Sequence, residues 1–160
     1  MSAMKNKQSS LIRLLDSHLA ALNKAKASLL LSIHKCEKFM HKSDKLTEAE
    51  EESCEALTAR FARAADIFTQ KVLAGIILLL GENPTTFIDK AQLAEKIGVV
   101  KSANELFEIR SIRNEIAHEY REVDLLTLFH STCDYSKKLC NLIDDANKYA
   151  EKIKKQLQTK

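Results

Sequence analysis

The chain has 160 residues, of which 45% are hydrophobic, and it contains one proline, three glycines and no tryptophan. Its 25 basic and 22 acidic side chains leave a formal net charge of +3, which is too balanced to indicate nucleic-acid binding by itself but still allows a local basic patch. This composition predicts one ordered, helix-rich domain with a substantial core rather than a disordered chain.

The spacing of the four cysteines does not indicate a metal site, and Cys133 and Cys140, seven residues apart on a predicted helix, are read as small core residues. Cys36, Cys54, Cys133 and Cys140 show neither a C-x-x-C pair nor a ligand-like spacing with histidine. No basic leader followed by an apolar segment opens the chain, and the longest apolar run, residues 72–80, is about half of what a membrane-spanning helix needs. We therefore expect no metal, no cofactor, no membrane partner and a cytoplasmic protein with free thiols.

The first predicted helix carries apolar side chains at spacings of three and four residues. These positions are Leu11, Leu15, His18, Leu22, Ala25, Leu29, Ile33, Cys36 and Met40. A second helix is predicted to start at Thr47, because Thr47 and Glu50 have the spacing of a capping box, and to end before the turn at residues 81–84. Its C-terminal part, residues 72–80, is apolar almost all round, which predicts burial on several sides or a subunit interface.

Three further helices follow along the chain. A short one is expected from about Phe87 to Ile97, started by Thr86 and Asp89 and ended by Gly98. Ser102 with Glu105 is expected to open the next helix, and Asp124 to cap a long last helix whose charged tail, residues 152–160, frays. We predict an all-α protein, an antiparallel up-and-down helical bundle with four long helices and one short helix, forming a single domain over residues 1–160 with an ordered core at about 9–155.

The segment Arg113-Asn114-Glu115-Ile116-Ala117-His118-Glu119-Tyr120 is the most informative part of the chain. On a helix that advances about 100° per residue, Arg113 falls near the middle of an apolar stripe. The stripe consists of Leu106, Ile109, Ile116, Ala117 and Tyr120. A guanidinium that faces a core needs a partner, so either a carboxylate or a phosphate-bearing ligand is expected to meet Arg113.

Arg113 and His118 would point about 140° apart on one continuous helix and could not reach the same small group. Either the helix ends near Ala117 and lets His118 turn, or two copies of the segment meet across a two-fold axis. Both routes would bring together groups suited to metal-independent phosphodiester cleavage, in which a histidine moves protons and an arginine stabilises phosphoryl oxygens. Asn114 is placed to orient His118 or to bind substrate.

A plainer interpretation is also open. In this interpretation Arg113 pairs with a core carboxylate such as Asp66 and His118 is a helix-end histidine, and the spacing alone favours it. His18 is expected in the core or an interface, and His34 and His41 on a solvated face, while His130 is read as structural.

The segment resembles the R-x(4)-H-x-Y signature of HEPN-domain proteins, in particular the HepT-like toxin branch that partners minimal nucleotidyltransferases. The order of helices agrees with this family over about residues 11–153. The resemblance implies a homodimer with paired motifs in a shared cleft, metal-independent RNase activity with Arg113 and His118 as the catalytic pair, and Asn114 in support. It also implies that a separate-chain nucleotidyltransferase antitoxin adenylylates Tyr120.

The resemblance leaves an alternative, since some HEPN proteins are non-catalytic binding subunits that present substrate or a tyrosine to their partner. The lysines of the first helix would steer RNA if they border the cleft, and are otherwise a solvated face. They are Lys24, Lys26, Lys35, Lys38 and Lys42.

Overall fold

The computed structural model describes residues 2–42, 45–118 and 125–158, and its regular structure over these residues is entirely helical. The elements are α1 (Ser2–Glu37), α2 (Glu48–Asp66), the π-helix η1 (Ile67–Val72), α3 (Leu73–Leu79), α4 (Phe87–Lys96), α5 (Ala103–Ala117) and α6 (Leu125–Gln158). No strand occurs in the described ranges, so the all-α prediction is confirmed.

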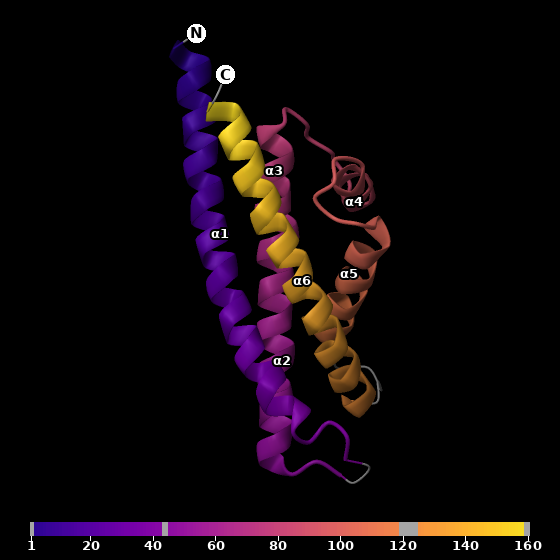
Figure 1. Cartoon of the computed structure of the whole chain (residues 1–160). Coiled ribbons are helices and arrows are strands. Elements are labelled where there is room, and N and C mark those ends of the chain that lie inside the picture. The colour runs from indigo at the N-terminus through magenta and orange to yellow at the C-terminus, as the bar shows by residue number, and fades with distance from the viewer. Residues whose placement is uncertain (1, 43–44, 119–124, 159–160) are drawn as a thin grey trace.

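The helices form an elongated antiparallel arrangement (Figure 1). α1 runs down one side, α2, η1 and α3 return as one continuous rod, α5 runs down again, and α6 crosses back diagonally so that the two chain ends lie at the same end of the molecule. The sequence predicted four long helices, but α5 has 15 residues against 36 in α1 and 34 in α6. The long rods are therefore three, and α4 and α5 cover only part of their length.

The predicted start of α2 is confirmed in detail. The backbone N–H of Glu50 donates to Thr47 Oγ1 over 3.3 Å, and the N–H of Thr47 donates to Glu50 Oε2 over 2.9 Å. These two bonds satisfy backbone donors that the first helical turn leaves free. Likewise Thr86 Oγ1 accepts from the N–H of Asp89 and starts α4, and Gly98 follows α4 with a φ of +82°, which favours glycine.

The start of α5 differs from the predicted pairing of Ser102 with Glu105. Ser102 Oγ accepts from the N–H of Asn104 over 3.2 Å, and the neighbouring N–H of Ala103 donates to Glu95 Oε2 over 2.6 Å. A side chain from α4 thus takes a donor at the start of α5, and this fixes the angle between the two helices. Asp124, predicted to cap α6, lies outside the described residues.

The core runs the length of the three long rods. The largest fully buried side chains include Leu15 and Leu22 of α1, Phe61 and Phe68 of the central rod, and Leu106 of α5. The apolar residues 72–80 are mostly buried, with Leu78 and Leu80 exposed. α6 stays helical to Gln158, past the point where fraying was expected, because Ile153 is buried and Lys154 binds Asp16 of α1.

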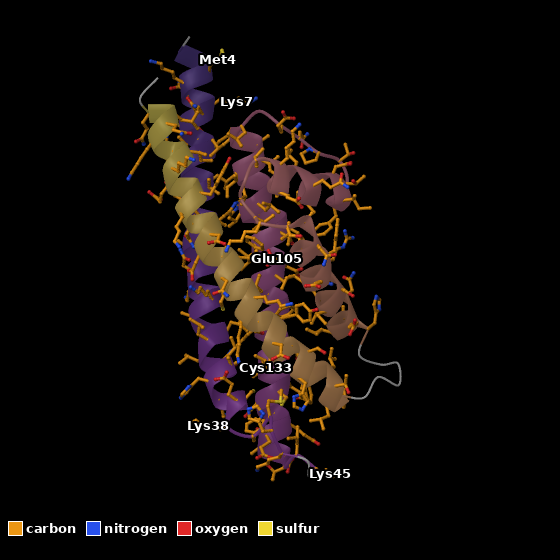
Figure 2. All side chains as sticks on the ribbon, turned by 45° about the vertical axis from the view of Figure 1, so that its right-hand side comes forward. Met4, Lys7, Lys38, Lys45, Glu105 and Cys133 are labelled. Atoms are coloured by element: carbon orange, nitrogen blue, oxygen red, sulfur yellow. The ribbon has the colours of Figure 1, made fainter. Side chains whose placement is uncertain are left out.

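All four cysteines are free and buried, as expected for core residues. Three of them meet at one end of the bundle, the end where Figure 2 labels Cys133 together with Lys38 and Lys45. Cys36 Sγ donates to the carbonyl of Ser53 over 3.4 Å, and burial raises the pKa of the neighbouring Cys54 thiol to about 12. A thiol held in its neutral form is a poor metal ligand and a poor nucleophile.

In the part of the chain that the structure describes, no group of three or more His, Cys, Asp or Glu side chains has the arrangement of a metal site. None of the helices in residues 2–42, 45–118 and 125–158 is both long enough and apolar enough to cross a membrane.

Candidate functional site

Arg113 meets a carboxylate. Its Nε donates to Oδ1 of Asp66 over 2.8 Å and its Nη2 donates to Oδ2 over 2.9 Å, so the two planar groups pair at two points. Each side chain is 34% exposed, and the hydrogen bond to Asp66 raises the pKa of the guanidinium. The partner that the sequence required is therefore a residue of the same chain, and Nη1 of Arg113 takes no part in this pair.

The apolar stripe of α5 is rotated from its predicted direction. Leu106 and Ile109 are fully buried as expected, but Ala103 and Ile112 are the other buried positions of α5, and Ala117 is exposed. Arg113 thus lies at the border of the stripe and not at its centre. This position explains how a charged group can keep contact with water while its methylenes pack on the core.

Asp66 is the last residue of α2 and directly precedes the π-helix. Within that segment the N–H of Leu73 donates to the carbonyl of Phe68, five residues earlier, which is the π-helical pattern. The wider turn changes which side chains face α5, and it brings Asp66, Thr69 and Gln70 to one groove. Such segments occur frequently at functional sites.

His118 is the residue that follows the last turn of α5. α5 ends at Ala117, and the backbone of His118 leaves the helix with φ −104° and ψ 22°. Its N–H still donates to the carbonyls of Asn114 and Glu115, both over 3.1 Å, while the residue is exposed. α5 therefore ends near Ala117, which is the helix end that the first of the two expected routes requires. Tyr120, expected to carry a modification, lies outside the described residues.

A groove of about 320 Å³ opens between the central rod, α4 and α5. Its walls include the Asp66–Arg113 pair and Asn114, so two of the expected site residues line it. The complete lining is Ala65, Asp66, Thr69, Gln70, Phe87, Ile109, Arg110, Arg113 and Asn114. This volume falls near the lower limit of typical small-molecule sites.

The groove carries more positive than negative charge. The guanidinium carbon of Arg110 lies 4.4 Å from the ring centroid of Phe87, over the face of the ring. Lys90 donates to the carbonyl of Thr69 over 3.4 Å, and its pKa is lowered first by burial and then by the charge of Arg110. Lys90 does not itself line the groove. Within the described ranges Arg110 pairs with no carboxylate, so its charge remains available to an anion in the groove.

The lysines of α1 lie elsewhere and are partly neutralised. Lys26 binds Asp144 of α6 and Lys42 binds Glu50 of α2, whereas Lys24, Lys35 and Lys38 are exposed. None of these lysines lines the groove. His34 and His41 are exposed as expected, and His18 is half-buried with its Nδ1 inside and unpartnered among the described residues.

Sequence reasoning missed Phe87, Gln70 and Arg110 as site residues. Arg110 carried a signal, because it lies one turn before Arg113 on α5 and so shares its face. Phe87 and Gln70 carried none, since they come from other helices and meet α5 only in the folded chain.

The chain is thus an all-α helical bundle with a cationic groove beside an arginine–carboxylate pair. It matches no family model, no curated protein and no solved structure. What the groove does must therefore be argued from its own chemistry.

Proposed function

We propose that this protein is a metal-independent endoribonuclease of the HEPN type, the toxin of a pair whose antitoxin is a separate-chain minimal nucleotidyltransferase. The observation that carries the proposal is the end of α5. Arg113 and His118 lie in its last turn and at its cap, and the helix stops where His118 must be freed from the helical direction. Arg113 and Asn114 also line a groove with Arg110, which pairs with no carboxylate among the described residues.

The cleavage uses the 2′-hydroxyl of the ribose as the nucleophile. His118 takes the proton of this hydroxyl, the 2′-oxygen bonds to phosphorus, and the bond from phosphorus to the 5′-oxygen of the next nucleotide breaks. That oxygen receives a proton from the partner subunit's His118 or from water, leaving a 2′,3′-cyclic phosphate and a 5′-hydroxyl. The partner enters because the family implies a homodimer with paired motifs.

Arg113 stabilises the charge on the phosphoryl oxygens in this scheme. Asp66 occupies Nε and Nη2 and holds the guanidinium in one orientation, while Nη1 is outside the pair. An already oriented donor loses little when charge develops in the transition state. Asp66 therefore acts as a positioning residue and not as a competitor that must leave.

The test is RNA cleavage by purified protein in excess EDTA, with the ends identified by their 2′,3′-cyclic phosphates. Arg113→Ala and His118→Ala should each abolish cleavage, while Arg13→Ala, which removes an arginine from α1, should cleave like wild type. Full activity in either motif variant would overturn the proposal.

The second candidate is a non-catalytic subunit that presents substrate or Tyr120 to the nucleotidyltransferase. The observation in its favour is the Asp66–Arg113 pair, which already satisfies two donors of the arginine. Under this function the wild-type protein is harmless when expressed alone and cuts no RNA. Mass spectrometry should then find an adenylyl group on Tyr120 after co-expression with a nucleotidyltransferase.

A further inference from the structure

Phe87 and Arg110 line the groove and pack against each other, and the proposed cleavage reaction does not use either residue. Phe87 is the first residue of α4, and its ring meets the ring of Phe107 edge to face, with centroids 6.1 Å apart and an interplanar angle of 61°. This contact fixes the ring on α5. The guanidinium of Arg110 lies over the ring at 4.4 Å, so the exposed arginine is held against a rigid support.

A supported guanidinium can stack on a nucleobase. Arginine is planar and weakly hydrated, and one face of its guanidinium covers Phe87 while the side chain lines the groove. Bases that are free of their helical neighbours stack on arginine planes and aromatic rings in RNA-binding proteins. The arrangement is therefore suited to a sandwich of ring, guanidinium and base.

The polar groups of the groove match the edge of a base. Gln70 comes from the π-helix and Asn114 from α5, and both line the same cavity. A primary amide offers two donors and one acceptor oxygen, which is the combination that base edges require. Among the described residues the amide of Gln70 makes one long hydrogen bond, in which its Nε2 donates to Asp66 Oδ1 over 3.5 Å, so the amide is weakly held by the protein.

The charges of the groove match a phosphate. Arg110 lines the groove, burial and the charge of Arg110 lower the pKa of the nearby Lys90, and no carboxylate pairs with either side chain in the described part of the chain. An anionic group beside Arg110 would be attracted by both cations. A phosphate next to the stacked base provides such a group and would stand apart from the phosphate that faces Arg113.

We propose that this groove is a subsite for one unstacked nucleotide of single-stranded RNA, with its base on Arg110 and its phosphate at the edge of the groove, where the Arg110 charge attracts it. The inference rests on the proposed function, because it takes RNA as the substrate. The groove measures about 320 Å³, and a base must leave its own stack before it can lie on Arg110. We therefore expect single-stranded RNA to bind better than duplex.

The first test is binding without cleavage. A short fluorescein-labelled single-stranded RNA and its duplex are titrated in the His118→Ala background, with fluorescence anisotropy as the readout. Adding Arg110→Met should weaken single-strand binding by about tenfold or more, since base stacking on such a platform contributes about 1–3 kcal/mol. Arg13→Met, which removes an equal charge from α1, should change it much less.

Two further variants separate stacking from charge. Arg110→Lys keeps the charge but loses the plane, and Phe87→Leu keeps apolar bulk but loses the ring, so both should bind single strands nearly as weakly as Arg110→Met. Full binding by Arg110→Lys would overturn the stacked base, and equal binding of duplex and single strand would overturn the subsite. Circular dichroism spectra that match wild type show that each variant is folded.

Cleavage measured in parallel keeps the two proposals apart. Loss of binding in Arg110→Met together with an inactive wild type rejects the nuclease and supports the subsite. Cleavage by wild type with an unchanged KM in Arg110→Met supports the nuclease and rejects the subsite. Tight binding of adenosine monophosphate with no binding of RNA would show a free-nucleotide site and reject the RNA subsite.

Discussion

Asp66 closes α2 and holds Arg113 of α5 by two parallel hydrogen bonds of 2.8 and 2.9 Å. The pair joins the residue that precedes the π-helix to the first residue of the R-x(4)-H motif. It is one-third exposed on both sides, so water weakens its contribution to folding. Its main consequence is geometric, because it fixes the plane of a guanidinium at the edge of a groove.

Asp66→Asn should separate the role of Asp66 in orienting Arg113 from its contribution to the stability of the fold. The amide keeps the size of the carboxylate but loses its charge, and we expect the free energy of unfolding to fall by no more than about 1 kcal/mol. In RNA cleavage kcat should fall about tenfold while KM stays near wild type, because a looser guanidinium binds but is poorly oriented. Chemical denaturation and steady-state kinetics measure the two effects, and a wild-type kcat would remove Asp66 from the mechanism.

Arg113→Lys should show that the forked shape matters and not only the charge. A lysine provides a single ammonium group and cannot pair at two points with Asp66 while also presenting a donor to phosphate. We expect cleavage to fall by about 10²-fold or more with the helical circular dichroism signal unchanged. Arg113→Ala serves as the reference for complete loss, and a lysine variant with wild-type rates would contradict the role of the fork.

Leu106→Ala should destabilise the bundle strongly. Leu106 is fully buried on α5, and truncation leaves a cavity as well as losing apolar contact, which costs about 2–5 kcal/mol. Ile88→Ala is the matched control, because Ile88 is 57% exposed on α4, and its cost should stay below about 1 kcal/mol. Urea denaturation of the two variants gives the comparison, and equal costs would show that α5 is not packed as described.

The buried thiol of Cys54 should make the protein sensitive to alkaline pH. Its pKa is about 12 in the folded chain against an ordinary value of 9.0, so the unfolded chain loses the thiol proton first. The contribution of this thiol to the free energy of unfolding is fully present below pH 9. It is lost as the pH rises from 9 toward 12, and the loss is at most about 4 kcal/mol.

Cys54→Ala provides the measurement for this effect. The free energy of unfolding is compared at neutral and alkaline pH in the variant and in wild type, so that the shared titration of lysines cancels. Wild type should lose more stability than the variant over this range. Equal losses would mean that the thiol does not titrate differently in the folded chain.

The sequence by itself determined the helical class and several helix boundaries. Periodicity and caps act within a few residues, so Thr47, Thr86 and Gly98 could be assigned without tertiary structure. The same reasoning showed that Arg113 needs a partner, and it left two routes open for His118, a helix end near Ala117 or a second copy of the segment.

Only the tertiary structure decided which partner Arg113 takes and what surrounds it. Asp66 lies 47 residues before Arg113, and local patterns made it one candidate carboxylate without selecting it. The π-helix and the packing of α4 on α5 then bring Gln70, Phe87 and Arg110 together in one groove. Such convergence depends on the register between helices, which is set by long-range packing and not by the spacing of residues along one helix.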